Sequence, residues 1–299
     1  MNRWRVIRPF DPWNSPLCTC PLKWTVNPYT GCGHKCLYCY ASSYIKDFFR
    51  PRLKERILAD ARRDLNSIPR GSVIELSASS DPFQPMEKDH MITYRLSREI
   101  LSRGYKILYT TKAPNILLEY KDLIERYRNR IAVAVTITTL NEKIASVLEP
   151  GAPPPSIRLK AIQELGKLGI PITVRIDPII PYINSDDESI KRLVEKIAEV
   201  GALQITSSTY KAKPDNFKRI SEAFPHLRKK LYDLYYVEGE SFKGYKYLPK
   251  NLRREMMSMV REYAVSMGLK FATCREDLVE LHTRNTVCDG SGFIRDIDG

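Results

Sequence analysis

Three cysteines near the amino end of the chain have the type and spacing of iron ligands. Cys32, Cys36 and Cys39 are spaced Cys-x3-Cys-x2-Cys within Asn27-Pro-Tyr-Thr-Gly-Cys-Gly-His-Lys-Cys-Leu-Tyr-Cys-Tyr40. Four cysteines would close a 4Fe-4S cluster as an electron carrier, whereas three leave one iron open. The open iron can chelate the amino and carboxylate groups of S-adenosylmethionine and pass an electron to its sulfonium. The spacing therefore predicts a cluster that does chemistry.

Two other uses of closely spaced cysteines fit this chain less well. A zinc site is normally built from Cys-x2-Cys pairs that give four ligands, and His34, the candidate fourth ligand, lies between two of the cysteines. A disulfide framework is disfavoured, because seven cysteines in 299 residues are few, odd in number and unevenly placed. Tyr38, just before the last cysteine, stands where an aromatic ring would flank an adenine.

With Tyr38, the cysteine motif resembles the radical S-adenosylmethionine superfamily. The surrounding residues are similar to the branch that includes spore photoproduct lyase and its DNA repair photolyase-like relatives. Phrases typical of this branch recur along the chain: Ser80-Asp-Pro-Phe-Gln-Pro-Met-Glu87, Thr110-Thr-Lys-Ala-Pro114, Leu148-Glu-Pro-Gly-Ala-Pro153, Asp177-Pro-Ile-Ile-Pro181 and Cys288-Asp-Gly-Ser291. The resemblance implies an incomplete βα barrel that binds a 4Fe-4S cluster and S-adenosylmethionine.

Polar residues after two early candidate strands are expected to hold this cofactor. Ser79, Ser80 and Asp81 can hydrogen-bond its amine or ribose, although Ser-Ser-Asp-Pro also has the chemistry of a plain turn. Lys112 is expected to pair with the methionine carboxylate, as the related enzymes suggest for a lysine in this area. The alternative for Lys112 is a surface lysine.

Later strands supply three further candidates. Thr138 ends a strand with a hydroxyl that can contact ribose or merely express β propensity. Arg175 alternates with apolar residues, and a charge inside a strand core requires a partner such as the cofactor or Glu149; an outward salt bridge is the alternative. Ile180 lies in a stretch, Pro178 to Pro181, that resembles the apolar loop packing against adenine in the superfamily.

The other four cysteines raise a separate question. Cys18 and Cys20 precede the expected barrel, and Cys274 and Cys288 lie in the carboxyl tail. If the tail folds back to the amino end, the four could ligate a second iron–sulfur cluster or a zinc ion. The alternatives are inert buried thiols or a hydrogen-atom donor, for which Cys288 and Cys274 are the candidates.

One departure from the branch bears on the reaction. Spore photoproduct lyase uses a cysteine hydrogen donor shortly before the Ser-Asp of the second-strand loop, and here that stretch reads Leu76-Ser-Ala-Ser-Ser-Asp81. The difference argues against photoproduct repair by the same route.

Short apolar runs alternate with longer amphipathic stretches, as expected of repeated βα units. The expected strands are Trp24–Val26, Ser72–Leu76, Lys106–Tyr109, Ala132–Ile137, Ile172–Ile176 and Leu203–Thr206. The expected helices are Asp47–Asn66, Tyr94–Arg103, Ile116–Tyr127, Ser156–Leu168, Glu188–Val200 and Asn251–Met267. Catalytic loops gather at the carboxyl ends of such strands, and the cysteine loop follows the first of them.

The predicted fold class is α/β, an incomplete (βα)6 TIM-like barrel with a carboxy-terminal cap or tail. Residues 1–23 form an amino-terminal extension, residues 24–207 the partial barrel, and residues 208–299 an extension packed on its open side, all within one structural domain. A short apolar run at Lys270 to Ala272 lies in that last part. Barrels of this length commonly form one domain.

Composition adds information on location and partners. No apolar run approaches the ~18 residues of a membrane span, and Met-Asn-Arg-Trp-Arg lacks a signal-peptide core, so we expect a cytoplasmic protein. The net charge of +13 favours a polyanionic partner. The stretch from Tyr210 to Tyr263 contains thirteen Lys or Arg residues, seven Asp or Glu residues and seven tyrosines. Basic side chains can bind phosphates, and aromatic rings can stack on bases.

These observations predict a radical S-adenosylmethionine enzyme. Reductive cleavage of the cofactor would give a 5'-deoxyadenosyl radical that abstracts a hydrogen atom from nucleic acid, in tRNA modification or DNA lesion repair. An external ferredoxin- or flavodoxin-like protein would supply the electron. The alternatives are a radical enzyme acting on a protein or small metabolite, and a non-catalytic metal-binding adaptor.

Overall fold

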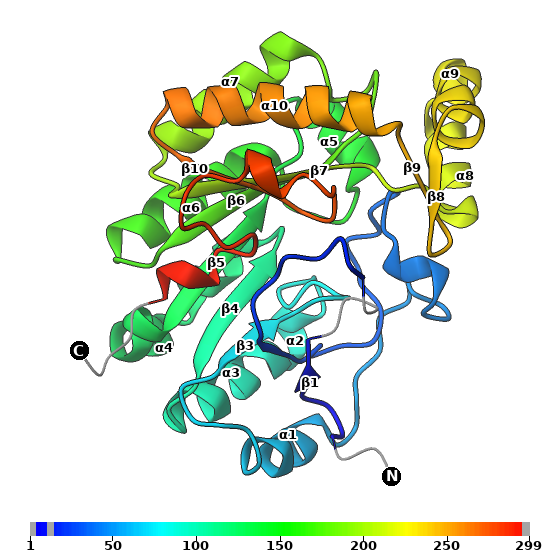
Figure 1. Cartoon of the computed structure of the whole chain (residues 1–299). Coiled ribbons are helices and arrows are strands. Elements are labelled where there is room, and N and C mark those ends of the chain that lie inside the picture. Colours follow the sequence, from blue (N-terminus) through cyan, green and yellow to red (C-terminus); the bar gives the residue numbers. More distant parts are fainter. Residues whose placement is uncertain (1–3, 11–14, 295–299) are drawn as a thin grey trace.

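A mostly parallel β-sheet forms the frame of the molecule. The computed structural model describes residues 4–10 and 15–294, and within them the main sheet has eight strands in the order β1-β2-β3-β4-β5-β6-β7-β10 (Figure 1). These are β1 Arg8–Pro9, β2 Trp24–Thr25, β3 Val73–Leu76, β4 Lys106–Thr111, β5 Ile131–Thr136, β6 Ile172–Ile179, β7 Gln204–Thr209 and β10 Lys270–Thr273. Strand β1 pairs antiparallel with β2, and the other pairings are parallel. Since β1 and β10 are the two edges, the sheet is the open α/β arrangement that the sequence predicts.

The central strands are buried on both faces. All six residues of β5 are buried, as are those of β7. A parallel sheet covered on both sides requires this near-continuous burial, because helices pack on one face and the barrel interior fills the other. All six expected strands are confirmed, with ends that differ by at most three residues.

Helices follow most strands and pack outside the sheet (Figure 1). Helix α7 begins after Asp186, whose side chain accepts a hydrogen bond from the Ser189 backbone N–H at 2.9 Å, and Asp187 and Glu188 in its first turn favour the same end. The α-helices are α1 Ile57–Leu65, α2 Glu87–His90, α3 Ile92–Ser102, α4 Lys121–Tyr127, α5 Glu142–Leu148, α6 Pro155–Lys167, α7 Asp187–Glu199, α8 Pro214–Ala223, α9 Arg228–Tyr232 and α10 Lys250–Ser266.

Two expected helices differ from the structure. The helix predicted from Asp47 starts only at Ile57, because Asp47 has a positive φ of 53° and Arg52 pairs with Thr30 through two backbone hydrogen bonds of 2.8 and 3.0 Å. The stretch from Ile116 to Tyr127 is split into a 3-10 segment, Pro114–Glu119, and α4. Local contacts of the cysteine loop outweigh helix propensity in the first case.

The carboxy-terminal part contributes more than a cap. Strand β10, which contains the apolar run expected at Lys270 to Ala272, pairs in parallel with β7 and forms an edge of the main sheet. Helix α10 packs against α7 and β7. Helices α8 and α9 and a small hairpin, β8 Glu240–Phe242 and β9 Tyr245–Tyr247, lie beside the sheet (Figure 1).

Both ends of the described chain meet inside the sheet's concave face. The buried Lys23 ammonium lies 3.0 Å from Glu75 Oε2 of β3 and 2.6 Å from Asp289 Oδ2 of the tail. Figure 1 shows the blue amino-terminal segment and the red tail in front of the strands. Among the described residues, none of the helices combines the length and apolar character that a membrane crossing requires.

Candidate cofactor site

Cys32, Cys36 and Cys39 open into one cavity of about 590 Å³. Residues following the carboxyl ends of β3, β4, β6 and β7 also line it, as expected for a parallel barrel. Of the residues predicted to contact the cofactor, Tyr38, Ser79, Ser80, Asp81, Lys112 and Arg175 line this cavity. The structure therefore brings the cysteine motif and six of the eight cofactor candidates together.

Close backbone contacts fix the cysteine loop. Gly31 has φ of 84°, and a Cβ there would lie 2.5 Å from the Phe48 carbonyl oxygen. A Cβ on Gly151 would lie 2.2 Å from the Gly33 carbonyl oxygen. The Gln84 side chain bridges the loop, accepting from Gly33 N at 2.7 Å and donating to Gly31 O at 3.1 Å. Glycine is required at both close approaches because a side chain would displace backbone.

The thiols of this loop suit an iron–sulfur cluster. Backbone N–H groups of His34 and Asp81 donate to Cys32, and those of Ala41 and Ser42 donate to Cys39. Such hydrogen bonds stabilise thiolate ligands and tune a cluster. Within the described residues, no three Cys, His, Asp or Glu side chains are arranged to hold one metal ion.

Tyr38 is anchored by a buried ion pair behind the cysteine loop. Its hydroxyl donates to Glu149 Oε1, and Arg158 Nη2 lies 2.5 Å from Glu149 Oε2. Burial opposes the charge on Glu149, but Arg158 and Lys112 outweigh it and lower the pKa of this carboxyl. Arg158 also donates to the carbonyls of Pro153 and Thr136, at 2.8 and 2.9 Å. Arg158 was not identified from the sequence. The only sign of its role in the sequence is that an arginine stands on the apolar face of a helix.

Asp81 organises the loops after β3 and β4. Its carboxylate accepts from Thr111 Oγ1, Lys112 N and Phe83 N at 2.7 to 2.9 Å, and His34 Nδ1 lies 3.3 Å away. Burial opposes the Asp81 charge, but His34 and these donors outweigh it and lower the pKa of Asp81 to about 2. The carboxylate is thus ionised and mainly engaged by the protein, so it positions the cavity wall.

The Lys112 side chain crosses the floor of the cavity. Its ammonium lies 5.5 Å from the centre of the Tyr38 ring. Burial alone would lower its pKa, but Cys36, Glu149 and Asp81 outweigh burial and raise it. Lys112 is therefore a charged, partly buried cation near Cys36, in place of the surface lysine that was its alternative.

Two predicted contacts lie elsewhere. Thr138 and Ile180 are buried but do not line the cavity, where Thr136 and Pro178 stand instead. The Thr138 hydroxyl lies 3.3 Å from Glu149 Oε1, and the Ile180 N–H donates to Asn184 Oδ1 at 2.7 Å. Both residues lie beyond the last residues of β5 and β6, Thr136 and Ile179, and they do not share the cavity with the other six candidates.

Arg175 points into the cavity, but its partner is not Glu149. The guanidinium lies 2.5 Å from Asp177 Oδ2 and also interacts with the Cys274 thiol. The expected Glu149 pairing is wrong, because Arg158 occupies that carboxylate. Asp177 is further held by Ser208 Oγ at 2.5 Å.

Charge and rings gather around the cavity. Seven Lys or Arg side chains line it against four Asp or Glu side chains. Beside its mouth, Lys213 Nζ lies 4.5 Å and the Arg275 guanidinium 4.9 Å from the centre of the Tyr245 ring. Basic and aromatic side chains of the wall and mouth include Arg8, Phe10, Lys35, Tyr44, Lys211, Tyr245 and Arg275.

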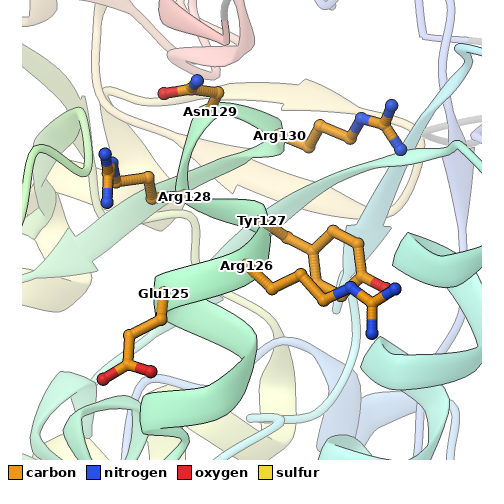
Figure 2. A pocket seen from close by; sticks show the side chains of 6 residues that line it. All are labelled: Glu125, Arg126, Tyr127, Arg128, Asn129 and Arg130. Atoms are coloured by element: carbon orange, nitrogen blue, oxygen red, sulfur yellow. The ribbon is translucent and has the colours of Figure 1, made fainter.

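A second hollow, of about 430 Å³, lies where α4 leads into β5. Figure 2 shows that the Arg128 side chain extends to one side, whereas those of Arg126 and Arg130 extend to the other with their guanidinium groups apart. It lies at the start of β5, whereas the cysteine cavity lies at the carboxyl ends of the strands. The diverging arginines do not converge on a ligand.

Comparisons with known proteins agree with this geometry. The family model described as "Radical SAM superfamily" matches residues 26–197, more than half of the chain. An uncharacterised protein, ORF301 of Acidianus two-tailed virus, is 29% identical over 206 residues, covering 61% of this chain and 65% of that protein. The radical SAM Nalpha-GlyT isomerase of Pseudomonas phage M6 is 25% identical over 261 residues, covering 83% of this chain and 53% of that protein. The chain thus spans less than two thirds of the length of these relatives.

Solved structures share the fold. A spore photoproduct lyase variant with bound AdoMet and dinucleoside spore photoproduct has a TM-score of 0.64 at 18% identity, covering 84% of this chain and 75% of that one. Streptococcus suis SuiB bound to the precursor peptide SuiA has a TM-score of 0.53 at 17% identity, covering 85% of this chain and 49% of that one. Together with the family match and the cysteine cavity, these similarities establish that the chain belongs to the radical SAM superfamily.

Proposed function

We propose that this protein holds a 4Fe-4S cluster on Cys32, Cys36 and Cys39, binds S-adenosylmethionine beside it and acts on nucleic acid. The observation that carries the proposal is that these three thiols share one cavity with a partly buried lysine, Lys112, and with the aromatic Tyr38. A cluster with one open iron supplies the electron that cleaves the cofactor to a 5'-deoxyadenosyl radical, which abstracts a hydrogen atom from the substrate.

The protein's own groups would bind and orient the cofactor. The Lys112 ammonium is a fixed cation suited to the methionine carboxylate. Ser79 and Ser80 offer hydroxyls in the cavity wall, and Pro178 offers an apolar surface for the adenine. Because Asp81, Glu149 and Arg158 are held by several partners each, they would keep this wall rigid.

The basic and aromatic mouth favours nucleic acid as the substrate class. Lys243 and Lys246 lie in the β8–β9 hairpin, and Lys213 follows Ala212, which bridges to Lys246. These three, which we call the hairpin lysines, each lie within 6.0 Å of an aromatic ring centre. Cations track a phosphate backbone, and rings stack on bases. The similar lyase structure contains a dinucleoside spore photoproduct, and the SuiB structure contains a precursor peptide, so a peptide substrate is the contrasting outcome.

The radical chemistry is tested by anaerobic reconstitution with iron and sulfide, followed by reduction and assay of 5'-deoxyadenosine. About four irons on the Cys32 group and formation of 5'-deoxyadenosine support the proposal. A protein that binds metal but never cleaves the cofactor would instead be an adaptor.

The substrate class is tested by the salt dependence of binding to a single-stranded DNA oligonucleotide and to bulk tRNA. Changing the three hairpin lysines to alanine should reduce the salt slope by about 2 to 3. The matched control changes Arg126, Arg128 and Arg130 to alanine, which removes the same charge at the hollow of Figure 2. Equal effects of the two variants, or no binding at low salt, would contradict the proposal.

The proposal also includes an electron donor and a location. A ferredoxin- or flavodoxin-like protein in the cytoplasm would reduce the cluster, since reducing conditions also protect it from oxygen. Replacing a chemical reductant by such a protein in the 5'-deoxyadenosine assay tests this part.

A further inference from the structure

Four cysteines outside the motif meet in space although they are far apart in sequence. Cys20 Sγ lies 3.2 Å from Cys288 Sγ, across 268 positions of the chain. The Cys18 thiol contacts that of Cys20, and Cys274 lies close enough to interact electrostatically with Cys18, Cys20 and Cys288. The amino-terminal segment, the loop after β10 and the tail thus bring four thiols to one place.

Buried bonds hold these segments together. Lys23, three residues after Cys20, pairs with Asp289, the neighbour of Cys288. The Cys288 carbonyl accepts from Thr206 Oγ1 of β7 at 2.7 Å, and Cys274 N donates to Ser207 O at 2.9 Å. The meeting of the four thiols is therefore fixed by the sheet itself.

The surroundings suit a group that carries negative charge. Lys23 and Arg175 both interact electrostatically with Cys20, and the Arg175 guanidinium contacts the Cys274 thiol. A four-thiolate metal centre has a net negative charge, which needs such cations in a buried site. Cys18, Cys20 and Cys274 line the same cavity as Cys32, Cys36 and Cys39.

The sulfur geometry favours metal ligation over a disulfide. A disulfide bond is about 2.05 Å long, and it would use only two of the four thiols. Sulfur atoms around a tetrahedral ion with bonds of about 2.3 Å lie about 3.8 Å apart, so the 3.2 Å contact needs a small adjustment. Among the described residues, neither cysteine group has three donors already placed around one ion, so both would move slightly on binding.

We propose that Cys18, Cys20, Cys274 and Cys288 ligate a second metal centre in the same cavity as the first. Four thiolates fully close the coordination of an iron–sulfur cluster or of a zinc ion. This centre therefore lacks an open metal position, in contrast to the centre on the motif cysteines. The inference goes beyond the proposed function, because metal binding at the second group does not require cofactor cleavage.

The test uses the full chain with Cys32, Cys36 and Cys39 changed to alanine, so that only the second group can bind metal. After anaerobic purification, and again after reconstitution with iron and sulfide, iron, zinc and acid-labile sulfide are quantified. About four irons with sulfide would identify a cluster, and about one zinc would identify an ion; either supports the site. The four remaining thiols should also resist alkylation until the metal is chelated.

The reciprocal variant has Cys18, Cys20, Cys274 and Cys288 changed to alanine. It should retain only the metal of the first group, and the single variant Cys288→Ser serves if the fourfold variant fails to fold. The proposal is overturned if the first variant holds no more metal than a chain with all seven cysteines changed, and if its four thiols react at the denatured rate. Loss of metal from the reciprocal variant alone would instead count against the proposed function.

Discussion

The two cysteine groups are built in opposite ways. Cys32, Cys36 and Cys39 lie on one loop of eight residues, and contacts from Gln84 and Gly151 shape it. The second group is assembled from three segments that join only through long-range contacts such as the Lys23–Asp289 pair. A local motif fixes ligand spacing within the sequence, whereas a dispersed group depends on the complete fold. The predictions below separate the two.

The largest expected effect is on cofactor cleavage. Cys36→Ala removes a ligand of the first group, and we expect the rate of 5'-deoxyadenosine formation to fall at least about a thousandfold, or ~4 kcal/mol in barrier. Cys20→Ala should leave that rate within about tenfold of the wild type, because the first loop is intact. Equal losses in the two variants would show that the groups act as one centre.

The next largest effect should come from removing one partner of each buried ion pair. Arg158→Met leaves the Glu149 carboxylate buried and unpaired behind the first loop, and Lys23→Met does the same to Glu75 and Asp289 beside the second group. Each should lower the free energy of unfolding by about 3 to 5 kcal/mol. Denaturant titration measures this, together with iron content.

Exposed ion pairs provide the control. Arg192→Met breaks a solvent-exposed pair with Glu188, and we expect a loss below about 0.5 kcal/mol. If Arg192→Met and Arg158→Met lower the free energy of unfolding by similar amounts, burial of the Arg158–Glu149 pair adds nothing to its contribution to stability.

Two glycines allow each group to be disturbed separately. Gly151→Ala places a Cβ 2.2 Å from the Gly33 carbonyl oxygen, and Gly290→Ala places one 2.5 Å from Thr173 Oγ1 at a φ of 80°. Each should cost about 1 to 3 kcal/mol. We expect Gly151→Ala to reduce metal at the first group and Gly290→Ala to reduce it at the second. Gly166→Ala in α6, where a Cβ meets nothing within 4 Å, is the control.

The last effect is pH-dependent and belongs to the first region. The pKa of Asp81 is lowered from 3.8 to about 2 in the folded chain. Its ionisation therefore stabilises the fold fully above pH of about 4, and the contribution of about 2 kcal/mol is lost as pH falls from about 4 to about 2. In the metal-free chain, Asp81→Asn should remove this part of the pH dependence. An unchanged acid unfolding curve would refute it.

The sequence predicted what depends on local pattern. The six strands and the three motif cysteines follow from periodicity and spacing, whereas Lys112 was expected from the family resemblance and an inward Arg175 was one of two alternatives. The partner of Arg175 could not be predicted, because Asp177 on the same strand and Glu149 at the end of α5 are both carboxylates and only the buried position of Arg158 decides between them. Thr138 and Ile180 lie just beyond the ends of β5 and β6, and the sequence pattern does not show how the chain turns there.

The failed helix at Asp47 has a similar cause. Its residues have helical propensity, but the backbone N–H and C=O of Arg52 form hydrogen bonds with Thr30, just before the cysteine loop. Strand β10 was missed as part of the sheet because four residues carry little periodicity, and its neighbour β7 is distant in the sequence. Non-local pairing decided each of these points.

The Lys23–Asp289 pair, separated by 266 positions, also imposes an order of assembly. A ribosome releases Lys23 early and Asp289 late, and the first cysteine loop also accepts hydrogen bonds from Asn216 and Arg219 of α8. All of these loop contacts can form before Asp289 emerges, whereas the wall that carries Cys20 and Cys288 requires the last part of synthesis. We therefore expect the first cysteine loop to take shape during translation and the second cysteine group to be completed at its end.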